Sequence, residues 1–205
     1  MIAVSNGPIL ESGDRLTRAE FHRRYCMRPD IKKAELVGGV VYVASPVRQE
    51  GHGGEHAIAI LWLGTYATRF PTLDVGDNST VFLDAENEVQ PDAFLYWRDP
   101  AKGGAQLSSD GYVVGAPPLV FEIAASSASY DLHDKLRAYR RAGTLEYIVW
   151  RTLDTAIDWF RLHEGEYVRV EPDQKGMIES SVFPGLRLHV PSMLARDRAG
   201  VLAAL

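Results

Sequence analysis

The sequence predicts a single α/β (α+β) domain, and three segments support this fold class. A nearly all-apolar run at residues 119–124, interrupted by one glutamate, is typical of a central strand covered on both faces. Across residues 54–70, apolar side chains recur with the spacing of an amphipathic helix. Gly38 and Gly39 separate two short apolar runs, and paired glycines supply the positive φ angles of a tight hairpin turn.

Caps, breakers and short apolar runs predict the remaining elements. Thr17 and Glu20 form a capping box that starts a short helix ending near residue 28. Another helix is expected from residue 127 or 129 to residue 142, where Gly143 stops it. Residues 98–115, rich in glycine and serine, indicate a long surface loop. Further strands are expected at residues 34–37, 40–44, 73–75, 80–83, 89–97, 145–150, 156–162 and 167–170, with a short helix from residue 191.

Length and composition fit one domain better than two. The chain has 205 residues without a linker-like tract, and single cores commonly reach this size. Hydrophobic residues make up 46% and charged residues 24%, so a well-buried interior is available. We expect a flexible leader over residues 1–14 and a single domain over residues 15–205.

The chain lacks the features of a secreted or membrane-spanning protein. Residues 1–10 have no basic flank followed by a long apolar run, and no later stretch approaches the length of a membrane span. Cys26 is the single cysteine and cannot form an internal disulfide, which agrees with a reducing compartment. We therefore expect a cytoplasmic protein.

The charge balance counts against nucleic-acid binding by bulk electrostatics. The net charge is −5, from 22 basic and 27 acidic side chains. A metal site concentrates carboxylates, however, and a local basic stripe can still contact phosphates. For the helical arginines, a solvated helix face is the alternative. The candidate phosphate contacts are Lys32, Lys33, Arg137, Arg140 and Arg141.

Glu122 is the anomaly in the apolar strand. An ionised carboxylate there costs several kcal/mol unless a cation or a proton compensates it. Strand alternation puts Val120, Glu122 and Ala124 on one face. The glutamate therefore either projects into a site or pairs with a basic side chain.

Asp92 is the second candidate acid. It follows Pro91, which removes a ladder donor, so the segment is expected to begin at a sheet edge or a bulge, where a side chain can be aimed at a site. The alternative is an aspartate that terminates a turn. Two carboxylates from neighbouring strands supply hard oxygen ligands suited to Mg²⁺ or Mn²⁺. Phosphodiester hydrolysis is the chemistry that such a site supports.

A combination of motifs makes the chain similar to a known family. These motifs are Gln90-Pro91-Asp92, Phe121-Glu122-Ile123, residues 131–135 with Tyr139, Gly143 and Glu146-Tyr147, and, in support, residues 35–43, Ser45-Pro46, His52-Gly53 and residues 182–186. Over about residues 15–190 the sequence resembles the Uma-type restriction endonuclease family of the PD-(D/E)XK nuclease superfamily. The resemblance implies a restriction-endonuclease-like core, in which helices flank a mixed central β-sheet, with an N-terminal β-hairpin.

The resemblance also implies roles for individual residues. In the wider superfamily a lysine follows the second acid by two positions, where this chain has Ala124; in the Uma-type pattern the matching lysine is Lys135 on the next helix. Asp131, Lys135 and Tyr139 share one stripe of that helix, and a surface ion pair between the first two is the alternative. We expect the Lys135 ammonium within about 6 Å of Asp92 or Glu122, the range over which opposite charges shift each other's pKa.

The expected metal is Mg²⁺ or Mn²⁺, bound between Asp92 and Glu122 with the Ile123 carbonyl as a third protein ligand. Glu35 and His52 match family positions as an additional ligand and a phosphate contact. A solvated strand residue and a loop residue are the alternatives for these two.

Two other catalytic interpretations are weaker. His52, Glu55 and His56 fit the H-x-x-E-H pattern of inverted zinc peptidases, but the two intervening glycines would weaken the helix that such a site needs. Ser126 and Ser127 near His133 lack a nucleophile elbow, and helix capping accounts for them better.

The predicted function is therefore metal-dependent endonuclease cleavage of DNA. Asp92 and Glu122 are the expected ligands and Lys135 the expected catalytic cation. A nuclease-fold protein that binds or interacts without cleaving is the alternative, and the acidic net charge favours it. A homodimer is expected because many nucleases of this superfamily are dimers.

Overall fold

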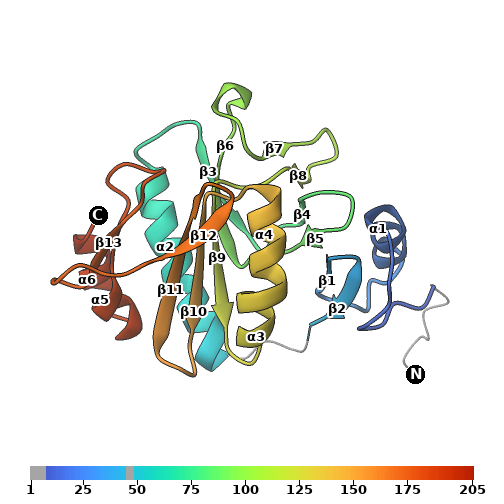
Figure 1. Cartoon of the computed structure of the whole chain (residues 1–205), viewed down its shortest axis with the longest axis horizontal. Helices are drawn as coiled ribbons and strands as arrows, with labels where there is room; N and C mark the ends of the chain where they lie inside the picture. The colour runs from blue at the N-terminus through green and yellow to red at the C-terminus, as the bar shows by residue number, and fades with distance from the viewer. Residues whose placement is uncertain (1–7, 45–48) are drawn as a thin grey trace.

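A six-stranded mixed sheet forms the centre of the computed structural model, which describes residues 8–44 and 49–205 (Figure 1). Its strands β9 and β10 run parallel, whereas the other neighbouring pairs run antiparallel. In spatial order the strands are β12 (Glu166–Val170), β11 (Ala156–His163), β10 (Glu146–Arg151), β9 (Leu119–Ala124), β6 (Ala93–Trp97) and β3 (Leu73–Asp77). The mixed sheet agrees with the predicted fold class.

Helices cover both faces of this sheet, as Figure 1 shows. Trp62 of α2 (Gly54–Ala67) packs in one core cluster with Phe121 and Ile123 of β9. Tyr139 packs in a second cluster, on the opposite face, with Val120 and Ala124. The predicted alternation of β9 is therefore confirmed. The second face is covered by α3 (Ala128–Tyr130), η3 (Asp131–Lys135) and α4 (Leu136–Ala142), and the α2 side also holds α5 (Val190–Leu194) and α6 (Arg198–Ala203).

The predicted helix after β9 is present, and its middle turn, η3, is π-helical. Gly143 ends it with a left-handed φ of 90°, as expected for a glycine stop. Because this helix connects two neighbouring parallel strands, it must return along the sheet from the carboxyl end of β9 to the start of β10. Its first turns therefore lie beside the end of β9 that carries Glu122.

A second sheet of short strands packs beside the first. It contains the predicted hairpin, and α1 (Arg18–Cys26) covers it by burying Phe21 against Leu36. Thr17 caps α1 by accepting a hydrogen bond from the Glu20 backbone N–H, while the Glu20 carboxylate pairs with neighbouring arginines. The strand order is β2 (Val40–Val43), β1 (Ala34–Val37), β5 (Glu88–Val89), β4 (Val81–Phe82), β8 (Val113–Val114) and β7 (Gln106–Leu107).

Two predictions about this region are wrong. Residues 98–115 are not a simple surface loop, because they contain η2 (Pro100–Lys102) and the paired strands β7 and β8. The single strand expected at residues 89–97 is two strands in two different sheets, since β5 pairs with β1 whereas β6 pairs with β9. The chain crosses between the sheets at residues 90–92.

Pro91 consequently lies in the crossover rather than at an edge or a bulge. β6 is an interior strand with β9 on one side and β3 on the other. The proline precedes the first ladder position, Ala93, so its missing N–H removes no ladder bond. Asp92 enters the large sheet from this crossover.

Two terminal regions complete the fold. Residues 8–14, part of the predicted leader, pack on the hairpin: Leu10 is only 3% exposed, and the Gly13 N–H donates to the Val41 carbonyl at 2.8 Å. Residues 1–7 and the motif Ser45-Pro46 lie outside the described residues. Near the C-terminus, β13 (Met177–Glu179) and β14 (Arg187–His189) form a small hairpin that the sequence did not indicate. No helix in the described ranges has the length and apolar character needed to cross a membrane.

Candidate active site

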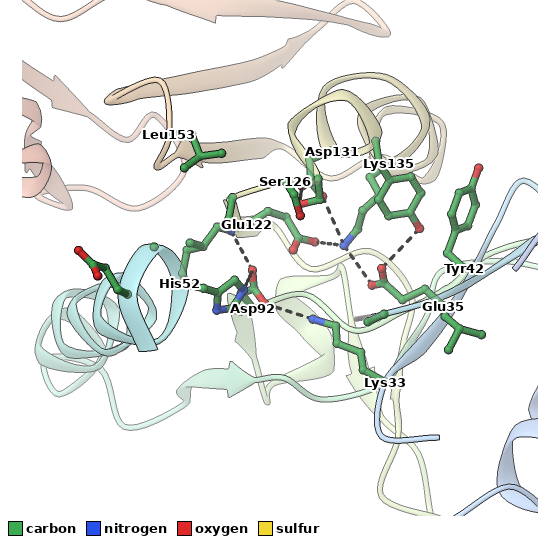
Figure 2. Close-up of a pocket in the computed structure, with 18 residues that line it drawn as sticks. Lys33, Glu35, Tyr42, His52, Asp92, Glu122, Ser126, Asp131, Lys135 and Leu153 are labelled. Carbon is green, nitrogen blue, oxygen red and sulfur yellow. Dashed lines mark hydrogen bonds and ion pairs between the residues drawn. The ribbon is translucent and has the colours of Figure 1, made fainter. Parts of the chain in front are cut away.

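A cavity of about 610 Å³ opens where the two sheets meet, beside the carboxyl end of β9. The β1–β2 hairpin, the turn at η1 (Gln49–Gly53) and the start of the α3–η3 helix enclose it. Figure 2 shows acidic and basic side chains from these elements turned toward one another. Ile123 and Leu153 are among the apolar residues that line the cavity. The polar lining of the cavity consists of Lys33, Glu35, Tyr42, Glu50, His52, Asp92, Glu122, Ser126, Ser127, Tyr130, Asp131 and Lys135.

Asp92 is held at the floor of this cavity by three donors. Its Oδ2 accepts a hydrogen bond from the Ile123 backbone N–H at 2.8 Å and lies 3.3 Å from His52 Nε2. Its Oδ1 accepts from Lys33 Nζ at 3.2 Å. Burial alone would raise the pKa of Asp92, but the His52 hydrogen bond and the Lys33 charge outweigh burial and hold the pKa well below its ordinary value. This carboxylate is therefore ionised at neutral pH.

Glu122 occupies a different electrostatic environment, although it is equally buried. Its Oε1 lies 2.6 Å from Lys135 Nζ and accepts a hydrogen bond from the Tyr139 hydroxyl at 2.9 Å. Burial, opposed by Lys135 but reinforced by the negative charges around it, raises the pKa of Glu122 to about 8. The sequence left two alternatives for Glu122, projection into a site and pairing with a basic side chain. Both apply, because Glu122 pairs with Lys135 and also lines the cavity.

Lys135 lies among three carboxylates and is only 2% exposed. Besides Glu122, its Nζ contacts Glu35 Oε1 at 3.0 Å and Asp131 Oδ1 at 3.8 Å (Figure 2). The predicted approach to within 6 Å is thus confirmed, and the alternative of a surface ion pair with Asp131 is wrong. Burial lowers the pKa of Lys135, but the attraction of these carboxylates outweighs burial and raises the pKa well above its ordinary value.

Glu35 and Asp131 anchor this network from opposite sides. Glu35 is buried on β1, where its Oε1 accepts the Gln90 backbone N–H at 2.7 Å and its Oε2 accepts the Tyr130 hydroxyl at 3.4 Å. It is therefore not a solvated strand residue. Asp131 accepts a hydrogen bond from the Ser127 hydroxyl at 2.6 Å, so this serine serves the network instead of acting as a free nucleophile.

The cavity carries more negative than positive charge, which favours a bound cation. Even with Glu122 protonated, two lysines, Lys33 and Lys135, face four further carboxylates, namely Glu35, Glu50, Asp92 and Asp131. Uncompensated carboxylates at short range repel one another, and a divalent ion relieves that repulsion. The charge balance and the oxygen donors thus fit a hard divalent cation.

The small number of protein oxygen ligands suits a metal ion that retains several water molecules in its coordination shell. Within residues 8–44 and 49–205, no cluster of three or more His, Cys, Asp or Glu side chains is arranged to hold a metal. Mg²⁺ is ordinarily bound through one or two carboxylates and retains water in its remaining positions. Asp92 and Glu122, with Ile123 beside them in the cavity lining, match that requirement.

The inverted zinc-peptidase pattern is not assembled around a common point. Glu55 pairs with Arg196 near the C-terminus. His56 Nε2 lies 2.8 Å from the Asp92 carbonyl oxygen and 3.0 Å from Asp77 Oδ1, whereas His52 contacts the Asp92 carboxylate. Glu55 therefore has a partner of its own, whereas the two histidines contact different atoms of Asp92.

The predicted phosphate contacts divide into two groups. Lys33 lines the cavity, and Lys32 is an exposed neighbour at the start of the hairpin. The three arginines lie further along the helix and do not line the cavity. Arg141 is about 20 Å from Ser127 along the helix axis at 1.5 Å per residue. Two of these arginines already have acidic partners: Arg137 pairs with Asp134, and Arg140 with Glu166.

Sequence reasoning gave no role in the cavity to Glu50, nor to three larger side chains, Tyr42, Tyr130 and Leu153. Each looks like an ordinary strand, helix or turn residue, and the three come together only in the fold. The Lys33–Asp92 ion pair was also missed, because its partners directly precede strands of two different sheets, β1 and β6. A signal was present for two of the three larger side chains, since Tyr42 belongs to the motif at residues 35–43 and Leu153 is a large apolar residue in an otherwise polar turn.

The arrangement of sheet, helices and acidic cavity defines a restriction-endonuclease-like nuclease fold. The family model named Uma2 and described as "Putative restriction endonuclease" matches residues 18–191. The chain belongs to this family.

The solved structures agree on the fold. A crystal structure titled as that of "a putative nuclease belonging to DUF820 from Anabaena variabilis ATCC 29413" matches with a TM-score of 0.62 at 12% sequence identity. The match covers 79% of this chain and 89% of the other. A search of curated proteins found no match.

Proposed function

We propose that this chain is a metal-dependent endonuclease that hydrolyses phosphodiester bonds of DNA at the Asp92–Glu122 cavity. The observation that carries the proposal is the meeting of three groups from separate elements: Asp92 from the crossover, Glu122 from β9, and Lys135 from the following helix, 2.6 Å from Glu122. Membership of a restriction endonuclease family supports the reaction class. DNA is the proposed substrate and the cytoplasm the proposed compartment.

Asp92 and Glu122, with the Ile123 carbonyl, would hold Mg²⁺ or Mn²⁺. When bound, such an ion polarises a phosphoryl oxygen and lowers the pKa of a water molecule. The Ile123 backbone N–H fixes the orientation of the Asp92 carboxylate through its 2.8 Å hydrogen bond. The strand itself thereby sets the relative positions of the two acids.

Lys135 is suited to stabilise negative charge rather than to accept a proton. Its raised pKa keeps the amine protonated at neutral pH, and a buried cation strongly stabilises charge that develops nearby. Lys33 and His52 contact Asp92 from the open side of the cavity. They are the proposed contacts for the phosphate beside the cleaved bond.

The second candidate is a nuclease-fold binding module without cleavage. One observation favours it: Asp92 and Glu122 both have basic partners within the chain, so the network is electrostatically supported without a metal. Such a module would bind DNA or another partner with or without divalent ions. A homodimer stays a prediction under either function.

A cleavage assay separates the two candidates. Supercoiled and linear DNA would be incubated with the protein in Mg²⁺, Mn²⁺ or a chelator, beside Asp92→Asn and Glu122→Gln. Cleavage that needs the divalent ion and is lost in both variants supports the nuclease. Binding without cleavage under every condition supports the silent module. Asp99→Asn, in a partly exposed helix cap outside the cavity, is the matched control and should cleave normally.

A further inference from the structure

Two tyrosines form an aromatic wall at one end of the acidic cavity. Tyr42 comes from β2 and Tyr130 from α3, and their ring centroids lie 4.2 Å apart with the planes tilted by 36°. Both line the cavity. The Tyr42 hydroxyl donates to Asp134 Oδ2 at 3.1 Å and the Tyr130 hydroxyl to Glu35 Oε2 at 3.4 Å. These hydrogen bonds hold both rings in place.

Leu153 lies at the other end of the cavity in Figure 2, with the carboxylates between it and Tyr42. It sits in the turn between β10 and β11 and is 75% exposed. A large apolar side chain here is not stabilised by packing in the core, since most of its surface faces solvent. The cavity therefore combines a charged floor with an aromatic group and an apolar group at its two ends.

The surroundings of the cavity offer little positive charge for binding the phosphates of a duplex. Duplex binding depends mainly on lysines and arginines that neutralise several backbone phosphates. Here the two lysines of the cavity are paired with its carboxylates, and the arginines of α4 do not line it. The net charge of −5 adds a general repulsion. Stacking, which needs no cations, is the interaction that this surface provides.

We infer that the strand cleaved at this site is unpaired, and that a base next to the scissile phosphate stacks against Tyr42 and Tyr130. The inference rests on the proposed function and names its substrate class, single-stranded DNA. Aromatic rings stack on any base, because every base has a π face. A base that is paired within a duplex keeps its faces covered by its neighbours and cannot reach such a wall without leaving the stack. Asp92, Glu122 and Lys135, each 2% exposed, lie at a depth that suits a flexible single strand.

The test measures binding and cleavage separately. A fluorescein-labelled single-stranded oligodeoxynucleotide and its duplex would be titrated by anisotropy in Ca²⁺, with gels to verify that the DNA stays intact. The wild type should bind the single strand at least ten-fold more tightly than the duplex. Tyr42→Leu should weaken single-strand binding about ten-fold, within the range for loss of one base–aromatic stack. Tyr42→Phe keeps the ring while removing the hydrogen bond to Asp134, and it should retain most of the single-strand affinity that Tyr42→Leu loses.

Matched controls separate stacking from folding. Tyr112 forms a comparable tilted pair with Phe82, at 4.8 Å, outside the cavity, so Tyr112→Leu should leave binding unchanged. Leu153→Ser replaces an exposed side chain and cannot disturb the core, and it should also weaken single-strand binding.

The outcomes distinguish this inference from the proposed function. Equal affinity for duplex and single strand, or binding that is indifferent to both Tyr42→Leu and Leu153→Ser, overturns the inference even if DNA is cleaved. Tyr42-dependent binding of the single strand without cleavage in Mg²⁺ or Mn²⁺ supports the inference for the binding step and contradicts the nuclease. Preferential cleavage of the single strand that is lost in Tyr42→Leu supports both.

Discussion

Two buried glutamates on neighbouring parallel strands have opposite surroundings. Glu146, at the start of β10, accepts hydrogen bonds from Ser180 Oγ at 2.5 Å and from the N–H and hydroxyl of Ser181 at 2.9 and 3.0 Å. Glu122, near the end of β9, faces other carboxylates and a lysine. The first carboxylate fastens the C-terminal segment to the sheet. The second lines a cavity in which negative charge is incompletely compensated.

The comparison teaches how a structural acid differs from a candidate functional one. Three hydrogen bonds from neutral donors and one contact with Arg161, at 3.4 Å, satisfy the lone pairs of Glu146 with no second carboxylate beside them, as expected for a carboxylate that stabilises a fold. Around Glu122, burial and then the neighbouring carboxylates Asp92, Asp131 and Glu35 destabilise the ionised form more than Lys135 stabilises it, which raises the pKa to about 8. Folded proteins retain such unfavourable charge mainly at functional sites.

The largest expected effect is on catalysis. Lys135→Met should lower kcat for DNA cleavage by about 10²–10³-fold, because it removes a buried cation that stabilises developing charge. Metal binding should persist, since both acids remain. Quenched-flow or gel assays would give kcat, and Mn²⁺ titration would give the metal affinity. Lys102→Met, which alters an exposed lysine over Trp97, is the control, and an equal loss in both variants would refute the assignment.

The second prediction concerns stability and contrasts the two glutamates directly. Glu146→Gln should lower the free energy of unfolding by about 2–3 kcal/mol, because the new amide group faces donors instead of accepting from them. Glu122→Gln should instead raise the stability of the metal-free protein at pH 7, by up to about 3 kcal/mol, because the amide resembles the protonated carboxyl of the folded state but needs no proton uptake on folding. Urea unfolding of both variants measures the contrast. A larger loss for Glu122→Gln would make Glu122 the structural acid.

The third prediction uses pH. Between the ordinary pKa of 4.5 and the folded-state pKa of about 8, folded Glu122 holds a proton that the unfolded chain has lost. Stability therefore falls as pH rises through this window, by at most about 1.4 kcal/mol per pH unit from this residue. The wild type measured against Glu122→Gln isolates that contribution. A difference between the two proteins that does not vary with pH would contradict the raised pKa.

Most of the large sheet could be predicted because its strands are long or strongly patterned. The apolar run of β9 and the amphipathic α2 carry clear periodicity, and the alternation along β9 predicted which face Glu122 occupies. Strands such as β7 and β8 have only two residues, too few for a period to emerge. The switch between sheets at residues 90–92 depends on pairing with β1 and β9, which local sequence does not encode.

The site was predicted only where a local motif or the path of the chain indicated it. Asp92, Glu122 and Lys135 belong to motifs, and the helix path after β9 brings the lysine back to the glutamate. Lys33 and Asp92 are far apart in the sequence and directly precede strands of two different sheets, so no local pattern links them. Likewise, the aromatic wall joins a hairpin residue to a residue of the first turn of the later helix.

The most direct measurement is a calorimetric Mn²⁺ titration of the wild type, of the double variant Asp92→Asn/Glu122→Gln, and of Glu146→Gln. All three are compared at one pH. The account predicts one site in the wild type and in Glu146→Gln, and no binding in the double variant, because only the cavity carboxylates are ligands. Equal Mn²⁺ binding in all three proteins would contradict the claim that Asp92 and Glu122 form the metal site.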